Sequence, residues 1–330
     1  MDKTARIPYI DLVKGICIIL VVMSHCEVLG FGDDKISCML DQLRMPLYFF
    51  LGGLFFKPIE FVPFAIKKIN RLIVPYLFFC TLYIIPTILF KQDSIQLNFN
   101  YWYNFYIGPA NYPLWFLVCL FNTYIIYYGI NLITAKWHIM WQSVIIITLT
   151  ACGWILSYHN SEIWESNELG RLFLYLRIPA TLMILPIFYA AILLKKFGFL
   201  HWNLNIWQNI VTILATIVLW YFFSNGNTFF VRNSIENAPI DFYIASLSSI
   251  ILITTIARII KKLPYVSYLG RYSIIVLVTH AFFITSLKDC QCLNNWLILI
   301  IILACMPATI WVLKKYLPKF TAQEDLITFR

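Results

Sequence analysis

Apolar runs long enough to cross a lipid bilayer recur along the whole chain, and they restrict the fold to a membrane bundle. A spanning helix takes about 20 apolar residues. Only 12% of the residues are charged, whereas a soluble domain usually holds about 25%. We therefore predict an all-α, polytopic membrane bundle of about ten transmembrane helices. The predicted spans are residues 7–30, 42–57, 71–90, 113–134, 139–158, 172–194, 206–224, 240–260, 272–288 and 294–313.

The second predicted span differs from the others because it is short and contains Pro46 and the pair Gly52-Gly53. Proline removes a helical hydrogen bond and glycine weakens a helix. We therefore expect this span to break at these residues and to be tilted or partly re-entrant. Residues 98–112 are aromatic and polar, which favours a loop at the bilayer surface, where Trp and Tyr are enriched.

The basic residues predict the orientation of the spans. With ten spans, the main clusters fall on the side of the N-terminus, and they are Lys3/Arg6, Lys57/Lys67/Lys68/Arg71, Lys136, Lys195/Lys196, Arg258/Lys261/Lys262/Arg271 and Lys314/Lys315/Lys319. The exceptions on the opposite side are Lys35, Arg44, Lys91, Arg171, Arg232 and Lys288. Because basic loops stay in the cytoplasm, we predict a multi-pass protein of the inner (plasma) membrane with both termini cytoplasmic.

The same topology explains the net charge of +9, so this charge does not indicate a nucleic-acid partner. We predict a single domain over residues 1–330, with no appended soluble domain and with a retained first helix in place of a cleaved signal peptide. Cys290-x-Cys292 is too closely spaced for a structural zinc pair, and the 5 histidines are scattered. No metal site is therefore predicted.

Four ionisable residues stand in the first predicted span, where a lipid-facing helix would have none. They are Asp11, Lys14, His25 and Glu27. Lys14 and His25 are eleven residues apart, about three helical turns, so they share one face and lie about 16 Å apart along the axis. Asp11 is close enough in sequence to pair with Lys14. A snorkelling pair at the helix start and a polar histidine at the outer interface would account for the same residues, and Glu27 is expected to be solvated.

The segment IDLVKGICIILVVMSH, which contains Lys14 and His25, resembles the first helix of the membrane acyltransferase-3 family. The signature of that family is a basic residue and a histidine with ten residues between them. Four later segments resemble the family in the same order: DQLRMPLYFFLGGLFFK, IKKINRLIVPYL with Lys68 and Arg71, YPLWFLVCLF with Trp115, and YLGRYSIIVLVTHAFF with His280. The resemblance extends over about residues 7–285 and is nearest to the fucose 4-O-acetylase-like branch.

The second of these segments departs from the family pattern at two positions. Arg44 stands where the family commonly has a histidine, and Gly52 stands where it commonly has a serine. Arg44 could bind an anionic acceptor or pair with Asp41 three residues earlier.

The resemblance implies an integral-membrane O-acyltransferase that moves an acyl group, acetyl in the first instance, from cytoplasmic acyl-CoA to a hydroxyl of a carbohydrate or glycolipid. Acyl-CoA would be a co-substrate, and no bound cofactor is implied. Lys67, Lys68 and Arg71 would bind the donor phosphates, although ordinary cytoplasmic topology also explains them. His25 would act as the general base, with Lys14 and Asp11 beside the donor.

Two further residues are left with open roles by the sequence. Trp115 would stack on a sugar or shape the acyl channel, or it would only pack. His280 would line the substrate channel, or it would be a polar group between helices. His138, His159 and His201 lie in or beside predicted loops and are not expected in the site.

A multi-helix transporter or flippase for a glycan or small molecule is the alternative function, and a non-catalytic helical scaffold is a third. Most ionisable groups lie near the ends of the predicted spans, and no pair of broken helices repeats in the two halves of the sequence, as transporters often show. The predicted enzyme would need no ion gradient, which distinguishes it from a carrier.

Overall fold

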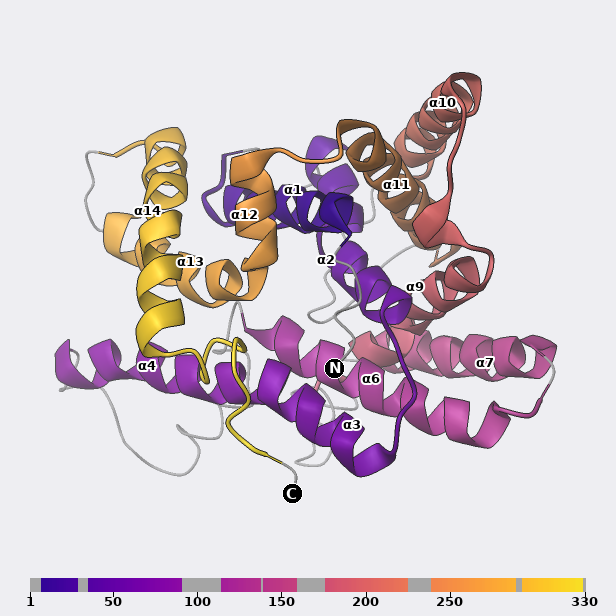
Figure 1. The fold of residues 1–330 in the computed structure, drawn as a ribbon, viewed down its shortest axis with the longest axis horizontal. Helices are drawn as coiled ribbons and strands as arrows, with labels where there is room; N and C mark the ends of the chain where they lie inside the picture. The colour runs from indigo at the N-terminus through magenta and orange to yellow at the C-terminus, as the bar shows by residue number, and fades with distance from the viewer. Residues whose placement is uncertain are drawn as a thin grey trace. The chain divides into compact units, whose positions relative to one another are not determined.

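The computed structural model describes residues 7–28, 35–90, 114–137, 139–158, 176–224, 239–288 and 293–328, and its regular elements there are all helical (Figure 1). The long helices are α1 (Pro8–His25), α2 (Lys35–Leu54), α4 (Val74–Phe90), α6 (Trp115–Thr134), α7 (Ile139–Tyr158), α9 (Ile178–Lys196), α10 (Ile206–Phe223), α11 (Pro239–Ile260), α13 (Ser273–Lys288) and α14 (Asn295–Tyr316). Each predicted span overlaps one of these helices, although several of the boundaries differ. The protein is thus an all-α, polytopic membrane bundle.

Seven of the described helices are long and apolar enough to cross a membrane, and an eighth crossing is possible if one bent pair counts as a span. Helix α10 illustrates how such a helix meets lipid. Thr216 is its one buried residue, while Trp207 and Phe222 are 73% and 62% exposed. A helix with so much exposed apolar surface is stable in a bilayer, where the surrounding acyl chains are themselves apolar.

Two predictions for the first two spans are wrong, namely the end of the first span and the break at Pro46 in the second. Helix α1 ends at His25 and not near residue 30, because Glu27 adopts a left-handed conformation with φ of 57°. Helix α2 runs unbroken from Lys35 to Leu54 with Pro46 inside it, so the break predicted at this proline is absent. A proline inside a membrane helix is tolerated when neighbouring groups satisfy the freed carbonyl.

The third span was predicted to begin at residue 71, but the helical segment that contains it begins at Phe61. A short helix, α3 (Phe61–Lys68), continues into one turn of π-helix, η1 (Ile69–Ile73), and then into α4. A π-turn holds one extra residue per turn and is frequent at functional sites. Here it contains Asn70 and Arg71.

The ninth predicted span is the second arm of a bent helix. A short helix, α12 (Pro264–Arg271), precedes α13, and the two axes differ by 91° across Tyr272. The predicted start at residue 272 is therefore the position of the bend.

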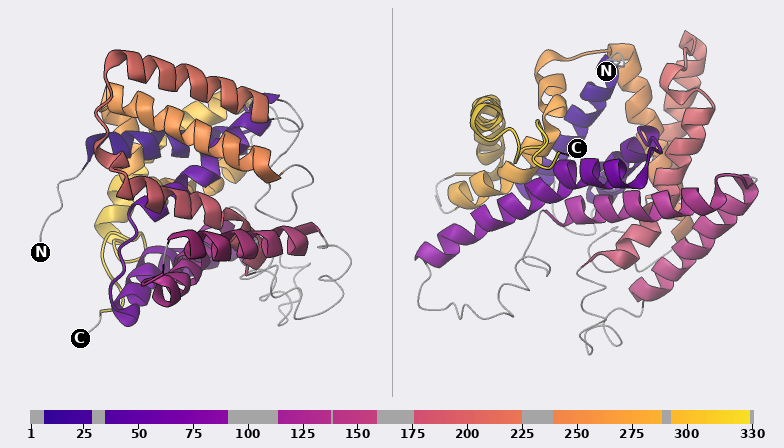
Figure 2. Two further views of the ribbon diagram at one scale, coloured as in Figure 1. Left: turned by 90° about the vertical axis from the view of Figure 1, so that its right-hand side faces the viewer. Right: turned by 60° about the horizontal axis from the view of Figure 1, so that its bottom comes forward.

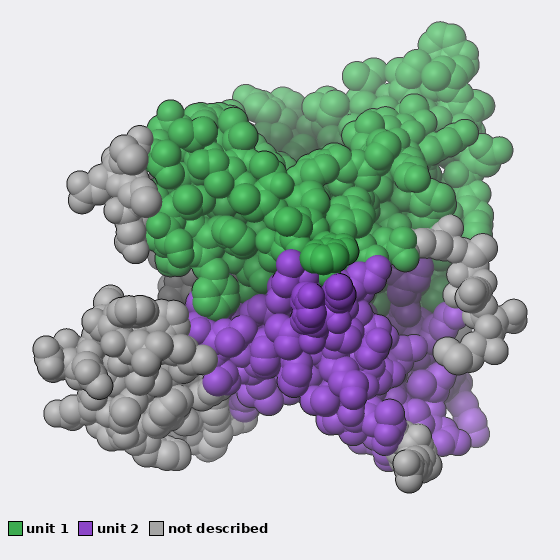
Figure 3. Space-filling view, turned by 60° about the vertical axis from the view of Figure 1, so that its left-hand side comes forward, with its two compact units in different colours: residues 1–54, 189–229, 236–311 green, residues 55–188, 230–235, 312–330 purple. Residues whose placement is uncertain are grey.

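The chain divides into two compact units (Figure 3). Unit 1 holds residues 1–54, 189–229 and 236–311, and in it α1 contacts α2, α11, α12 and α13, while α10 lies beside α11 (Figure 2). Unit 2 holds residues 55–188, 230–235 and 312–330, and in it α6 contacts α3, η1 and α7.

Candidate functional site

Helices α1 and α12 touch through their backbones in unit 1, at the turn of α1 that contains Lys14. A Cβ on Gly15 would overlap the carbonyl of Val266, and a Cβ on Gly270 would overlap the carbonyl of Asp11 and the amide of Gly15. No other residue type fits at either position without moving the main chain. The crossing therefore fixes how far α1 and the bent pair α12–α13 can slide past each other.

Ten residues after Gly15, α1 contacts α13 through two histidines. The rings of His25 and His280 are stacked, with centroids 5.0 Å apart and planes inclined by 29°. His280 is completely buried, whereas His25 is half-buried at the last residue of α1. The structure thus brings together the histidine predicted as general base and the histidine whose role the sequence left open.

The hydrogen bonds of His280 define its tautomer. Its Nδ1 lies 3.0 Å from the Val276 carbonyl oxygen, which can only accept, so Nδ1 carries a proton and donates it. In the neutral ring the lone pair is then on Nε2. This Nε2 is buried and has no hydrogen-bond partner among the described residues. A buried acceptor of this kind is rare in folded proteins and suits a site for a hydroxyl donor.

The turn after His25 is tied to the ends of two other helices. The Glu27 carboxylate accepts a hydrogen bond of 2.7 Å from the Lys288 ammonium at the end of α13, and the Glu27 carbonyl accepts one of 3.3 Å from the Asn295 amide at the start of α14. Glu27 is exposed, as expected for a solvated residue, and its carboxylate also pairs with Lys288. The ion pair joins the end of α1 to the helix that carries His280.

Helix α2 contacts α1 through polar groups between Lys14 and His25. The Cys17 thiol donates to the Arg44 carbonyl over 2.8 Å, and the Tyr48 hydroxyl donates to the Lys14 carbonyl over 3.2 Å. The Arg44 side chain forms an ion pair with Asp41, one of the two partners that the sequence left open. Gly52, the second departure from the family pattern, is buried near the end of α2.

Asp11 and Lys14 are both half-buried on α1 and both take part in polar interactions. Their pairing with one another stays a prediction, as does their part in donor binding. Both residues lie beside the contact of α1 with α12.

The basic segment of unit 2 comprises Lys67, Lys68 and Arg71. The Lys68 ammonium lies 3.3 Å from the centre of the Tyr124 ring on α6, a cation–π contact, and Lys67 is exposed. Burial, and to a lesser extent the charge of Lys67, lowers the pKa of Lys68 to about 7. Lys68 therefore changes charge near neutral pH, which an ordinary surface lysine does not do.

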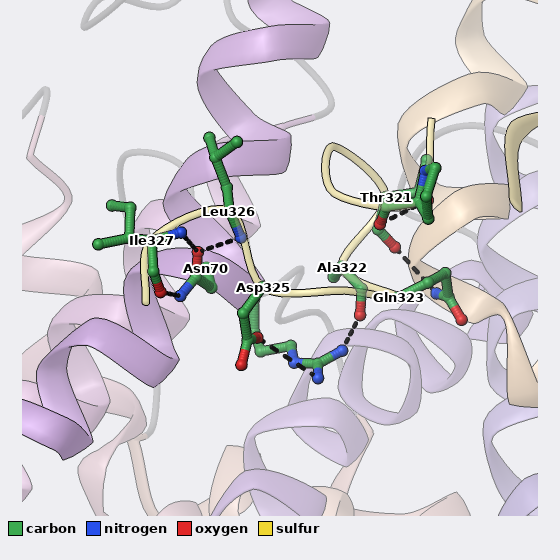
Figure 4. A network of polar contacts seen from close by, with 9 residues as sticks. Asn70, Thr321, Ala322, Gln323, Asp325, Leu326 and Ile327 are labelled. Carbon is green, nitrogen blue, oxygen red and sulfur yellow. Dashed lines mark hydrogen bonds and ion pairs between the residues drawn. The ribbon is translucent and has the colours of Figure 1, made fainter. Parts of the chain in front are cut away.

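Asn70 and Arg71 hold the segment that follows α14 (Figure 4). The Asn70 side chain accepts hydrogen bonds from the amides of Leu326 and Ile327 and donates one to the Ile327 carbonyl. The Arg71 guanidinium donates to the Ala322 carbonyl and lies 3.6 Å from the Asp325 carboxylate. Lys68 and Arg71, which the sequence groups as one phosphate-binding pair, thus contact different elements.

Trp115 is the first residue of α6 in unit 2 and is 9% exposed. Its ring makes an edge-to-face contact with Phe116, with centroids 6.3 Å apart. Such burial fits either of the two roles that the sequence left open, so the part of Trp115 in a substrate channel stays a prediction.

Three of the basic residues that fall on the side predicted to be opposite the N-terminus lie in the described residues, and each of them contacts a partner. Lys35 lies 4.7 Å from the centre of the Tyr221 ring, Arg44 pairs with Asp41, and Lys288 pairs with Glu27. The other exceptions fall outside the described residues, as do His138 and His159. His201 is exposed in the 3₁₀ turn η5 (Phe199–His201).

The described part of the chain contains no group of three or more His, Cys, Asp or Glu residues that could hold a metal ion. Sequence reasoning missed the pairing of Glu27 with Lys288, and it missed Asn70 and Asp325. The signals that could have found the first were present, since Lys288 is a basic residue on the acidic side of the predicted bundle. No comparable signal points from Asp325 to Arg71, because these residues are far apart in the sequence.

The model of the acyltransferase-3 family, described as an acyltransferase domain, matches residues 7–314. The match covers nearly the whole chain, including α1 with its histidine, the basic segment and the bent pair α12–α13. Comparisons with curated proteins and with solved structures found no match.

Proposed function

Since the chain belongs to the acyltransferase-3 family, we propose that it is a membrane O-acyltransferase that uses cytoplasmic acyl-CoA, most simply acetyl-CoA, to acylate a carbohydrate or glycolipid of the cell envelope. The family membership establishes the acyltransferase class. The acyl group, the acceptor and the roles of individual residues belong to the proposal. The proposed acceptor follows the resemblance to the fucose 4-O-acetylase-like branch.

In the proposed reaction, a sugar hydroxyl attacks the thioester carbonyl of the donor. A bond forms between the hydroxyl oxygen and the acyl carbon, and the carbon–sulfur bond breaks. His25 takes the hydroxyl proton, and that proton passes to the departing thiolate, so the products are an ester and free CoA. General-base assistance of this kind contributes about 10²–10⁴ to a rate.

The stacked pair of His25 and His280 is the single observation that carries this proposal. An imidazole buried in an apolar bundle is costly unless its nitrogens are hydrogen-bonded, and His280 has one nitrogen that lacks such a bond. The unpartnered Nε2 of His280 would accept a hydrogen bond from a second hydroxyl of the sugar. The acceptor would then be oriented by one histidine while the other removes the reacting proton, a division of roles that a polyhydroxyl substrate allows.

The basic segment is proposed to bind the phosphates of the donor. Arg71 and Lys67 are partly exposed, and arginine and lysine are the usual phosphate-binding residues of proteins. Lys14 and Asp11 would lie on the donor side of His25, on the cytoplasmic half of α1. This orientation is the one predicted from the distribution of basic loops.

The test uses the purified protein in detergent, [¹⁴C]acetyl-CoA, a glycan extract of the cell envelope and no ion gradient. We expect label to be transferred to glycan by the native protein, and transfer by His25→Ala to fall by about a hundredfold or more. His201→Ala is the matched control, because His201 is exposed in η5. Mass spectrometry of the labelled glycan would identify the acyl group and the acceptor.

Equal transfer by the His25→Ala variant would remove His25 from the mechanism. Absence of any donor consumption by the native protein, combined with gradient-dependent uptake of a glycan in vesicles, would favour a carrier over an enzyme.

A further inference from the structure

The chain that follows α14 is folded against the start of α4 in unit 2. We call residues 317–327 the C-terminal strap. Its Phe320 ring stacks on Phe78 of α4, with centroids 4.3 Å apart, and the Gln323 and Glu324 amides both donate to the Pro318 carbonyl. The strap is therefore an ordered turn and not a trailing end.

Asn70 anchors the far end of the strap. Its side-chain oxygen accepts hydrogen bonds of 2.9 Å from the Leu326 and Ile327 amides, and its side-chain nitrogen donates one of 2.8 Å to the Ile327 carbonyl (Figure 4). Asn70 is 1% exposed. A buried amide with three backbone partners is costly to separate, because each group would lose a hydrogen bond away from water. This end of the strap is therefore firmly held.

Arg71 contacts the strap quite differently. The side chains of Arg71 and Asp325 are 43% and 50% exposed, and the atoms of their ion pair are 3.6 Å apart. A long, exposed ion pair of this kind contributes little to stability and exchanges readily with other charged groups. Asp325 is thus a loosely held carboxylate on a guanidinium that a phosphate could also reach.

The strap is also strained where Arg71 contacts it. Ala322 has φ of 60°, in the left-handed region that residues with a Cβ rarely adopt, and its carbonyl accepts the hydrogen bond from Arg71. Strain of this kind persists only when the surroundings enforce it. Loss of the hydrogen bond from Arg71 would let the Ala322 backbone relax. This part of the strap would then leave Arg71 at little cost in free energy.

We propose that the C-terminal strap regulates donor binding, with the Asp325 carboxylate and a phosphate of acyl-CoA competing for Arg71. This inference rests on the proposed function, in which Arg71 binds the donor phosphates. Asn70 keeps the carboxylate next to Arg71, which gives Asp325 a high effective concentration without a strong contact. Entry of the donor displaces Asp325 and releases the strap near Ala322, while Asn70 retains the end of the chain.

The test measures coenzyme A binding to the full chain in detergent by calorimetry, which needs no acceptor. In Asp325→Asn the competing charge is gone, so we expect the dissociation constant to fall about two- to fivefold. In Ala322→Gly the docked strap loses its strain, so the constant should rise by a similar factor. Glu324→Gln is the matched control, because it removes the neighbouring carboxylate without touching Arg71, and it should leave binding unchanged.

Amide hydrogen exchange reports on the strap independently of affinity. Coenzyme A should raise exchange at residues 322–325 in the native protein, while the amides of Leu326 and Ile327 stay protected. Coenzyme A that binds the native protein and Asp325→Asn equally well would overturn the strap proposal and leave the donor assignment intact. Coenzyme A that binds neither would overturn the donor assignment itself.

Discussion

The histidine pair of unit 1 and the basic segment of unit 2 are held in opposite ways. His25 and His280 are positioned by main chain, through the contact of Gly15 with Gly270 and through the Val276 carbonyl. Lys68 and Arg71 are positioned by side chains, on an aromatic ring and on a half-exposed carboxylate. The first arrangement cannot adjust without moving a helix, whereas the second can exchange one partner for another.

This difference corresponds to what each region is proposed to do. Proton transfer needs groups held within a fraction of an ångström, and a small misplacement costs a large factor in rate. A group that binds and releases a nucleotide each cycle benefits from weak, replaceable contacts. Changes to the main-chain contact should therefore have larger effects than changes to the charges.

The largest effect is expected at the helix crossing. Gly270→Ala would place a methyl group against the backbone of α1, which cannot move as a side chain can. Overpacking usually costs about 1–3 kcal/mol, and a clash with main chain belongs at or above the upper end of that range. We expect a lower midpoint of thermal unfolding in detergent, measured by size-exclusion chromatography after heating.

Gly129→Ala provides the matched control, because a Cβ at Gly129 of α6 has nothing within 4 Å. The higher helix propensity of alanine should leave that variant as stable as the native protein or slightly more so. Equal stability of Gly270→Ala and Gly129→Ala would mean that the α1–α12 contact does not hold the bundle together.

The next largest effect is expected at His280. In His280→Asn the shorter side chain leaves the stack with His25, and we expect turnover to fall by about a hundredfold while coenzyme A binding stays unchanged. His201→Asn should keep native turnover. If His280 only packs between helices, the substitution should lower thermal stability and leave the turnover of the folded fraction intact.

A smaller effect is expected from the charge of Lys68. Its pKa is lowered to about 7, so the side chain is mostly charged at pH 6 and mostly neutral at pH 8. The affinity for coenzyme A should therefore weaken as pH rises across this interval, by about fivefold if Lys68 contacts a phosphate. Arginine keeps its charge throughout, so the Lys68→Arg variant should lose this pH dependence. The same pH dependence in both proteins would assign it to another group.

The smallest effect is expected at the ion pair between Glu27 and Lys288, whose side chains are 48% and 35% exposed. Exposed ion pairs contribute about 0–1 kcal/mol, so Glu27→Gln should lower turnover no more than about two- to threefold. The loss should be smaller in high salt, which already screens the pair. Glu60→Gln, a change at an exposed carboxylate of unit 2, is the control and should have no effect at any ionic strength.

Hydropathy was enough to predict the helices, because a lipid bilayer accepts little else than apolar helices of nearly fixed length. Their ends were predicted less well. The end of α1 depends on the backbone conformation of Glu27. The bend at Tyr272 lies next to the contact of α12 with α1. Neither feature can be recognised from the pattern of apolar residues. Pro46 was given too much weight, since other parts of a bundle can compensate for a missing hydrogen bond.

The candidate site was predictable in part. Helical spacing placed Lys14 and His25 on one face, and the resemblance singled out His280, although its role was left open. The contact between the two histidines could not be derived, because it joins residues far apart in the sequence through the packing of two glycines. The docking of Asp325 on Arg71 was equally hidden, since a single carboxylate near a chain end looks like any solvated residue.

The two glycine–histidine intervals of unit 1 have equal lengths. Gly15 precedes His25 by ten residues, Gly270 precedes His280 by ten residues, the glycines touch, and the histidines stack. The two segments therefore carry their histidines at the same number of residues from the glycine contact. A residue inserted into one segment alone would rotate its histidine by about 100° away from the other. The length of each segment, and not only the identity of the residues at its ends, is thus what keeps the two histidines together.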